Sequence, residues 1–527
     1  MVERTTQGLA KAAVIVSVAM ALSRVLGFFR NSAISLVFGQ NRLTDMLNAS
    51  FIVPDTIYLI LVGGGISSAF VPVLSGYLAE KKDANVWRTA SIAFNLVLVA
   101  VGAAVAICML LAPLLVRVVA PGFTPHEVAY TAYLTRIVLM AILFHCLNGV
   151  LMGTEYAYQS FIGTSLGPLV YNAAIIIFGL ILAKTCGIAA FAYSTLIGAA
   201  LNFLVQLWGV WRLKPVYTFS LDLRDPGILR TVKLMLPVSV GLSIAQINLF
   251  INQTFIASFL PSGSINALTI SSRVVLVPIL FSASMGITLL PALTRRAREK
   301  DMKTFAHYLT TSLRAIIFIA LPGTVGLIVL AEPIIRILFE HGRFTPADTL
   351  VTAQALTYYS LGIIAYGTYE ILSRAFYALE DTITPLKISL VTLAVGTSLN
   401  FTLGPLWGVR GLALAYSLAG FVNICLLYRA LARRVQGLDM KRIGQTFTKS
   451  LVASLFMGAL IFLLAPHFIL PVNWIALIRE AIELVSLILL GALFYLALAY
   501  LLRMEEYTAL FNFLGRRLQR VAVRRQN

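Results

Sequence analysis

The sequence predicts an all-α polytopic membrane protein with about 14 transmembrane helices: two six-helix lobes related by a pseudo-twofold axis, plus two C-terminal helices. Three observations lead to this fold class. The 527 residues are 59% hydrophobic and only 12% charged, and their mean hydropathy of +0.88 is too high for a soluble chain of this length. Apolar runs long enough to cross a bilayer follow one another along the chain. Short motifs also recur at a nearly constant distance.

Apolar runs of about 20 residues or more define the expected spans. They lie near residues 8–38, 45–77, 88–116, 127–154, 159–184, 188–211, 228–260, 264–294, 306–331, 347–378, 384–404, 408–431, 446–466 and 474–502. The first, second, seventh and eighth runs are longer than a bilayer requires, so these helices must tilt, break or protrude. Gly63-Gly64-Gly65 predicts a break in the second, and Pro278 is expected to interrupt the eighth.

The distribution of basic residues predicts the orientation in the membrane. On a soluble protein the net charge of +19 would suggest a nucleic-acid partner. Here the basic residues gather in short loops on one side of the predicted spans, as the positive-inside rule requires, so no nucleic acid is expected. Both termini are therefore predicted to be cytoplasmic. The basic tail, residues 503–527, is either an amphipathic helix on anionic headgroups or a solvated end.

An internal repeat predicts the two lobes. Phe123-Thr124-Pro125 recurs as Phe344-Thr345-Pro346, and Gly187 recurs as Gly408, with the same offset along the chain in both cases. An even number of helices per repeat places both lobes in the same orientation, and substrate sites of such transporters lie between the repeats. We expect an N-lobe at residues 1–220, a C-lobe at 221–440, two further helices at 441–502 and the tail at 503–527.

Charged side chains inside apolar runs mark the candidate site. Arg24 and Arg30 lie in the first span and Arg273 lies in the eighth. An arginine at the centre of a bilayer costs about 2.5 to 3.5 kcal/mol on insertion scales, so it usually faces a partner or a wet cavity. At 1.5 Å per residue, Arg24, Tyr58 and Arg273 are expected at one depth, roughly 13 to 20 Å below the outer face. Asp45 and Asp55, in the second span, are candidate counter-charges for Arg30.

The planar guanidinium fork suits phosphate because it donates two parallel hydrogen bonds and stays charged. Arg24 and Arg273 therefore predict a chamber that holds a diphosphate. The alternative is that these arginines pair with carboxylates such as Asp45 or Asp55.

Enzyme signatures are missing from the sequence. It contains no G-x-x-x-x-G-K-[ST], H-E-x-x-H or G-x-S-x-G motif. The four cysteines have neither metal-ligand spacing nor the pattern of a disulfide framework. We expect a protein that is not an enzyme and that needs neither a cofactor nor a metal.

Several segments resemble the MurJ/MviN family of lipid II flippases. They are SRVLGFFRNSAISLVFG from Ser23, SSAFVPVLSGY from Ser67, ASFLPSGSINALTISSR up to Arg273, GITLLPAL from Gly286, GRFTPAD from Gly342 and SRAFYALEDTITPLKIS from Ser373. The resemblance runs from about residue 10 to residue 430. It implies the multidrug/oligosaccharidyl-lipid/polysaccharide exporter fold, with two lobes around a cationic cavity and a groove for a lipid tail beside the last two helices.

The resemblance carries over residue by residue. Arg24 and Arg273 match two cavity arginines of the family, and Arg30 and Asp45 match further functional positions. Tyr58 stands where the family has another cavity arginine. Other departures from the family's charged positions are Asn31, Gly63 and Leu276. The chain therefore keeps the diphosphate-binding pair and lacks part of the charge ring.

The resulting hypothesis is a flippase that moves undecaprenyl-diphosphate-linked peptidoglycan precursor from the inner to the outer leaflet by alternating access. This task belongs to peptidoglycan biosynthesis, cell-wall biogenesis and cell shape, in the bacterial cytoplasmic (inner) membrane. The expected partners are the polyprenyl-diphosphate-linked glycan, membrane lipids and the cell-wall synthesis machinery. The alternatives are a flippase for another polyprenyl-linked glycan and a cation-coupled exporter of the same superfamily. A third is a membrane polymerase using Glu340 and Asp348.

Overall fold

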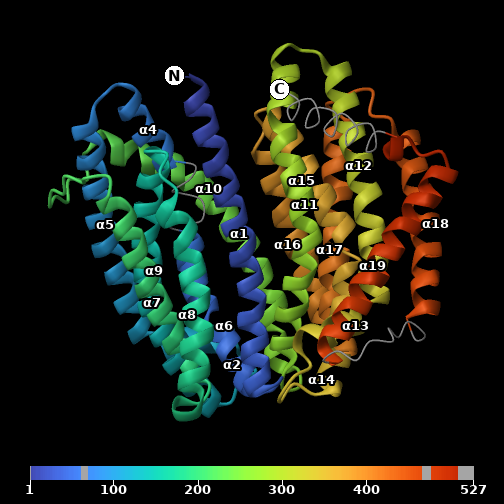
Figure 1. Ribbon diagram of the computed structural model, residues 1–527, viewed down its shortest axis with the longest axis horizontal. Helices are drawn as coiled ribbons and strands as arrows, with labels where there is room; N and C mark the ends of the chain where they lie inside the picture. The colour runs from blue at the N-terminus through green and yellow to red at the C-terminus, as the bar shows by residue number, and fades with distance from the viewer. Residues whose placement is uncertain (1, 61–68, 466–475, 509–527) are drawn as a thin grey trace. The chain divides into compact units, whose positions relative to one another are not determined.

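The computed structural model describes residues 2–60, 69–465 and 476–508, and every regular element in these ranges is helical (Figure 1). The all-α fold class is therefore confirmed for this part of the chain. Ten of its helices are long and apolar enough to cross a membrane. The total of about 14 spans stays a prediction.

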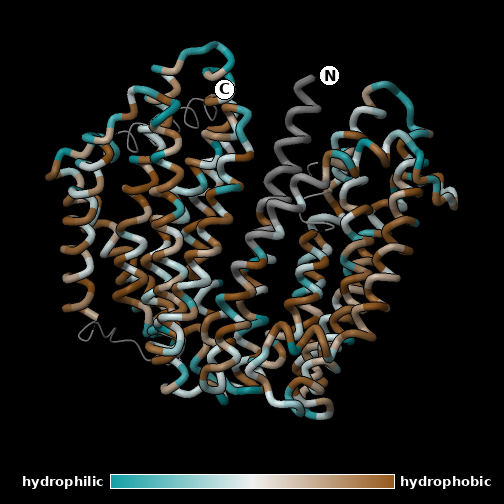
Figure 2. The backbone as a smooth tube through the Cα atoms, turned by 180° about the vertical axis from the view of Figure 1, so that it is seen from behind, coloured by the Kyte–Doolittle hydropathy of each residue, from teal (hydrophilic) through white to brown (hydrophobic). Residues whose placement is uncertain are grey.

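The chain forms two compact units. The first contains Met1–Asn266 and Phe339–Asp348, and the second contains Ala267–Leu338 and Thr349–Asn527. Figure 2 shows hydrophobic residues along the helices and hydrophilic residues gathered in the turns at their ends, as expected for helices that meet lipid. These units do not coincide with the predicted lobes, because residues 221–266 group with the first. The lobe boundary, which rests on the repeat, stays a prediction.

The helices of the first unit are α1 (Val2–Phe38), α2 (Arg42–Ser50), α3 (Ile52–Tyr58), α4 (Val71–Ala79), α5 (Asp83–Leu110), α6 (Ala112–Val119), α7 (Pro125–Ala157), α8 (Ile162–Cys186), α9 (Ala189–Trp211) and α10 (Pro226–Phe250). Helix α7 lies at the centre, in contact with α5, α6 and α9 as well as α2 and α3. It begins at a capping box in which Thr124 N donates to Glu127 Oε2 over 2.8 Å. Leu134 and Leu139 in its middle are fully buried.

The predicted second span consists of separate short helices in the described residues. Its first break falls at Phe51, between α2 and α3. The predicted break at Gly63-Gly64-Gly65 lies outside the described residues.

The helices that make up most of the second unit are α11 (Ser264–Arg298), α12 (Met302–Val329), α13 (Ala331–Phe339), α14 (Pro346–Ser360), α15 (Ile363–Ala378), α16 (Ile383–Trp407), α17 (Val409–Ala432), α18 (Met440–Leu464) and α19 (Ala476–Leu501). The first residues of α11 and α14 and the last residue of α13 belong to the first unit. The expectation that Pro278 interrupts its helix is wrong, because α11 continues through both Pro278 and Pro291. Proline removes one backbone donor, and a membrane helix tolerates this where neighbouring groups satisfy the freed carbonyl.

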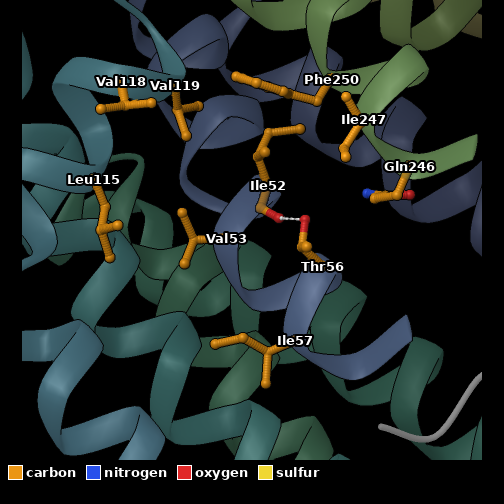
Figure 3. A pocket seen from close by; sticks show the side chains of 10 residues that line it. All are labelled: Ile52, Val53, Thr56, Ile57, Leu115, Val118, Val119, Gln246, Ile247 and Phe250. Atoms are coloured by element: carbon orange, nitrogen blue, oxygen red, sulfur yellow. Dashed lines mark hydrogen bonds between the residues drawn. The ribbon is translucent and has the colours of Figure 1, made fainter. Parts of the chain in front are cut away.

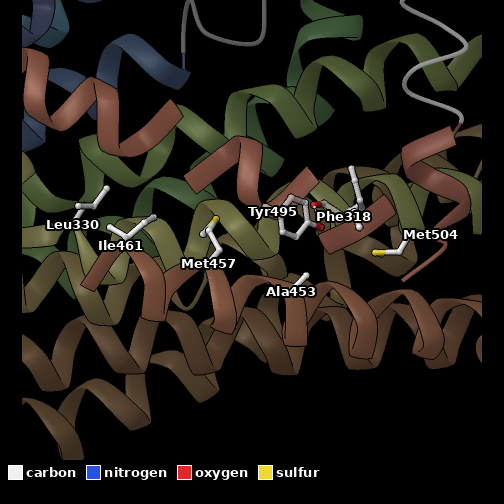
Figure 4. Close-up of a cluster of buried hydrophobic side chains, with 8 residues drawn as sticks. Phe318, Leu330, Ala453, Met457, Ile461, Tyr495 and Met504 are labelled. Carbon is white, nitrogen blue, oxygen red and sulfur yellow. Dashed lines mark hydrogen bonds between the residues drawn. The ribbon is translucent and has the colours of Figure 1, made fainter. Parts of the chain in front are cut away.

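Helices α18 and α19 pack against α12 through a cluster of buried side chains (Figure 4). Phe318 of α12 and Met457 of α18 meet Tyr495 of α19 in this cluster. The Tyr495 hydroxyl donates a hydrogen bond of 2.8 Å to the Phe318 carbonyl. The buried phenol thereby satisfies its polar atom while its ring fills the core.

The repeat found in the sequence recurs in the helix bounds. Helix α16 begins and ends the same number of residues after α8 along the chain. The same number of residues separates Gly408 from Gly187. The α7 segment corresponds to α14 and α15 together, with that same offset at both ends. Helix α12 likewise has the length of α5 and corresponds to it at a nearly equal offset. Two stretches of the chain therefore fold into the same succession of helices.

Candidate functional site

Arg24 and Arg30 lie on α1 in the first unit, which packs against α8. Asn172 of α8 donates through Nδ2 to Ser23 Oγ over 3.2 Å, one residue before Arg24. Arg24 itself is exposed, and it forms no hydrogen bond or ion pair with the residues that the structure describes. Arg30 is half-buried and lies about 9 Å further along the helix. The α1–α8 contact thus fixes the part of α1 that carries Arg24.

Tyr58, the last residue of α3, lies in an aromatic group of the first unit. The centroid of its ring is 5.9 Å from that of His145 on α7, and the His145 ring is 4.9 Å from Tyr171 on α8. The structure therefore brings Tyr58 and Tyr171 to one histidine. Nothing in the sequence marked His145, because it is an isolated polar residue in an apolar helix.

Asp45 is fully buried at the start of α2. Its Oδ2 accepts a hydrogen bond of 2.7 Å from Gly263 N, and its Oδ1 accepts one of 2.9 Å from Asn266 N. Its ion-pair partner is Arg42, whose Nη1 is 3.8 Å from Oδ2. Within the described residues Asp45 therefore holds the start of α11, and the alternative in which it neutralises Arg24 is not observed.

Arg273 lies on α11 in the second unit and is half-buried. Two residues earlier, the Ser271 hydroxyl donates to the Thr352 carbonyl of α14 over 2.8 Å, which fixes the position of this turn. Arg24 and Arg273 belong to different units, and their convergence on one anion stays a prediction.

A further arginine of the second unit, Arg374 on α15, has an incomplete set of partners. Its Nη2 is 3.4 Å from Glu370 Oε2 on the same helix, and its buried Nε makes no hydrogen bond to any described residue. Gly286 of α11 gives it room, because a Cβ there would lie 3.3 Å from Arg374 Cγ. The pair joins adjacent turns of one helix.

The first unit also contains an apolar pocket of about 240 Å³ (Figure 3). Residues of α3, α6 and α10 line it: Ile52, Val53, Thr56, Ile57, Leu115, Val118, Val119, Gln246, Ile247 and Phe250. Thr56 turns its hydroxyl to the Ile52 carbonyl at 2.7 Å, so the lining offers little to a charged group. The chemistry of this pocket suits an alkyl chain and not a diphosphate.

In the described ranges, no three His, Cys, Asp or Glu side chains come together in a way that could hold a metal ion. The Thr345 backbone N–H donates to Asp348 Oδ2 over 2.8 Å, which makes this carboxylate a cap of α14. That role leaves the polymerase alternative, which needed Asp348 beside Glu340, without support.

A comparison with protein families decides the assignment. The model of the lipid II flippase MurJ family matches residues 34–480. This chain belongs to the MurJ family. The match contains Asp45, Tyr58 and Arg273, whereas Arg24 and Arg30 precede it.

Curated MurJ proteins are similar over most of their length. A probable lipid II flippase MurJ from Buchnera aphidicola is 31% identical over 436 residues, which cover 81% of this chain and 84% of that protein. The probable MurJ of Rickettsia prowazekii is 27% identical and covers 94% of this chain and 98% of its own length.

Solved structures agree with the MurJ assignment. A lipid II flippase MurJ in an inward closed conformation has a TM-score of 0.74 at 27% identity, covering 91% of this chain and 98% of that one. An inward-facing MATE family multidrug transporter has a TM-score of 0.68 at 16% identity, covering 81% and 98%. The second likeness shows the fold alone. As a MurJ protein, the chain is a multi-pass protein of the inner membrane.

Proposed function

We propose that this protein is a flippase that moves lipid II, the undecaprenyl-diphosphate-linked peptidoglycan precursor, from the inner to the outer leaflet by alternating access. The match of the MurJ family over residues 34–480 carries the proposal. Intramembrane arginines add chemical support, because a diphosphate is a ligand that offsets their cost in the bilayer.

The proposed headgroup site uses residues of both units. Arg24 and Arg273 bind the diphosphate as planar forks, each donating two hydrogen bonds to phosphate oxygens. Arg30 adds positive charge, and Tyr58 packs its ring against His145. Asp45 acts indirectly by holding the start of the helix that carries Arg273.

The proposed architecture completes this mechanism. It has 14 transmembrane helices, two six-helix lobes divided near residue 220, two further helices and cytoplasmic termini with the basic tail. The part of the tail at residues 509–527 lies outside the described residues. The prenyl chain stays in lipid beside the last two helices, and the cell-wall synthesis machinery is the proposed receiving partner.

Replacement of the two arginines tests the proposal. Arg24→Ala and Arg273→Ala should each abolish growth of a MurJ-depleted cell, because a methyl group donates no hydrogen bond to phosphate. Arg24→Lys and Arg273→Lys should retain partial function, since the charge remains but the fork is lost. Growth and the fraction of lipid II exposed on the outer leaflet are the measurements, with protein abundance followed by immunoblot.

Arg336→Ala is the matched control, because Arg336 is an exposed arginine paired with Glu332 on one helix. It should complement fully. Full growth of both alanine variants at Arg24 and Arg273 would reject the proposed site, and purified protein that moves no lipid II would reject the function.

The alternatives differ in the ligand that they require. A flippase for another polyprenyl-linked glycan keeps the arginine dependence but fails to restore lipid II exposure. A cation-coupled drug exporter binds a cationic amphiphile and needs acidic cavity residues. Binding of such a drug in place of diphospho-lipid by the purified protein would establish that reading.

A further inference from the structure

A buried polar cluster lies where the end of α7 meets the start of α8 and the second half of α9. Glu155 of α7 and Gln206 of α9 are fully buried, and Asn202 of α9 is 8% exposed. All three belong to the first unit. None of them has a part in the proposed headgroup site.

The carboxylate of Glu155 is only partly compensated. Its Oε1 accepts a hydrogen bond of 3.1 Å from Gly163 N, and its Oε2 accepts one of 3.0 Å from Thr164 N. These donors belong to the first turn of α8, whose dipole favours a negative charge. No cationic side chain pairs with Glu155 among the described residues. A buried carboxylate ordinarily has a cationic partner or binds a metal ion.

The neighbouring amides bring further oxygens to the same place. A Cβ built on Gly163 would lie 2.5 Å from Glu155 Oε2 and 2.9 Å from Gln206 Oε1, so these two acceptors approach one point. A Cβ on Gly167 would collide with Asn202 Oδ1. Gln206 Oε1 and Asn202 Oδ1 make no hydrogen bond to any residue that the structure describes. Gln206 Nε2 is unpaired as well, so three buried amide atoms of this cluster have no partner among the described residues, whereas buried polar atoms ordinarily have one.

The internal repeat shows that the fold does not need Glu155 or Gln206. With the offset that relates α16 to α8, Glu155 corresponds to Phe376 and Gln206 corresponds to Leu427, and both of these are fully buried. Asn202 corresponds to Asn423, which is buried too and whose Oδ1 likewise has no partner among the described residues. The start of α16 is capped by its own neighbour, since Asp381 Oδ1 accepts from Ile383 N at 3.0 Å and from Thr384 N at 2.9 Å. At the equivalent junction of the second unit, apolar side chains therefore replace the carboxylate and the glutamine amide, and a local cap holds the helix start.

We propose that Glu155, Gln206 and Asn202 form a binding site for a small monovalent cation of the sodium class. One carboxylate and two amide oxygens supply hard ligands with a single negative charge, which matches one alkali cation better than a divalent one. The bound cation joins α7, α8 and α9 at this junction. The site stands independently of the proposed lipid substrate.

Thermal unfolding of the purified protein in detergent, without substrate, tests the site. Sodium chloride replaces N-methyl-D-glucamine chloride at constant ionic strength. The unfolding temperature of the wild type should rise with sodium and then level off, as expected when a ligand binds only the folded state. Glu155→Gln and Gln206→Leu should both lose this response. Gln206→Leu introduces the residue that the second unit uses at the equivalent position, so it keeps the test valid if Glu155→Gln does not fold.

Asp381→Asn is the matched control, because it weakens a helix cap at the equivalent junction without touching the site, and it should keep the sodium response. Binding of radioactive sodium to the wild type, and its loss in Gln206→Leu, provides a second readout. A wild type whose unfolding temperature does not change with lithium, sodium or potassium would overturn the proposal. In that case the amides turn to donate hydrogen bonds to Glu155. A response that persists in both variants would overturn it as well.

Discussion

Each carboxylate oxygen of Asp45 accepts a backbone hydrogen bond from the segment that leads into α11. The side chain is fully buried, so the two donors, Gly263 N and Asn266 N, have no water to replace it. Asn48 adds a side-chain bond of 2.9 Å to Asn266. A residue first selected as a counter-charge thus supports the start of the helix that carries Arg273.

Asp45→Ala should therefore reduce stability before it affects substrate binding. Leaving buried N–H groups without an acceptor costs about 1 to 3 kcal/mol. The measurement is the unfolding temperature of the purified protein, compared with that of Glu332→Ala. Glu332 belongs to an exposed ion pair, whose loss should change stability little. An Asp45→Ala variant that unfolds like the wild type but no longer moves lipid II would instead assign Asp45 to the substrate.

At the scale of elements, the same glycine turn ends two corresponding helices. Gly187 follows α8 with φ of 58° and ψ of −142°, and Gly408 follows α16 with φ of 59° and ψ of −134°. A side chain rarely adopts this backbone conformation. No heavy atom lies within 4 Å of a Cβ built at either position. Any cost of a substitution here is therefore conformational and not steric.

Gly187→Ala and Gly408→Ala should each destabilise the protein by about 1 to 3 kcal/mol, and by similar amounts. Gly444→Ala in α18 is the control, because that position is also open but has a helical backbone. It should be neutral or stabilising, by about 1 kcal/mol at most. The unfolding temperatures of the three variants, compared with that of the wild type, measure these losses. Unequal losses at Gly187 and Gly408 would mean that the two turns are not mechanically equivalent.

The sequence predicted the succession of elements better than their breaks. Motifs such as Phe123-Thr124-Pro125 marked helix starts, because a capping threonine and an N-terminal proline act locally. The interruptions at Phe51 and Leu111, and between Ser360 and Ile363, were not predicted. Apolar residues flank the break at Leu111 on both sides, so hydropathy does not register it.

At the scale of the whole chain, a charged network in the second unit fastens the segment after α19. Arg314 of α12 donates through Nη1 to Glu505 over 2.9 Å and through Nε to Glu506 over 2.7 Å. Thr446 of α18 also donates to Glu506, over 2.7 Å. Three elements distant in sequence therefore depend on one guanidinium group.

This network predicts a loss of stability in acid. The hydrogen bond and positive charge of Arg314 lower the pKa of Glu505 below its usual 4.5. Because the pKa is lower in the folded than in the unfolded chain, the stabilisation is complete above about pH 4.5 and disappears as the pH falls through the folded pKa. Glu505 is well exposed, so solvent screening makes the effect small.

Glu505→Gln should therefore unfold slightly below the wild type at neutral pH, and the difference should vanish in acid. Unfolding temperatures over a pH series measure it. Glu299→Gln is the comparison variant away from this network: Arg295 and Arg296 lower the pKa of Glu299 in the same way, so its loss of stability should also vanish in acid. A difference for Glu505→Gln that stays constant down to acid pH would show that its charge plays no part.

The candidate site was predictable to different degrees. Arg24 and Arg273 stand out in the sequence because placing a charged side chain in an apolar membrane helix costs free energy, whatever that helix packs against. His145 and the Glu155 cluster did not stand out. Glu155 and Gln206 lie on different helices, far apart in the chain. The free-energy cost of burying a neutral amide depends on whether its neighbours in the fold form hydrogen bonds with it, and the sequence does not show those neighbours.

The sequence alone determined that this chain is a helical membrane protein of the MurJ family, built from two copies of one succession of motifs. Hydropathy, capping and glycine turns are local properties, so each can be recognised without knowing what lies beside it. Only the tertiary structure decided that Asp45 holds the start of α11 and that Glu155 and Gln206 face one another. Hydrogen bonds and uncompensated buried charges arise between residues far apart in the chain, and they exist only once the helices have packed.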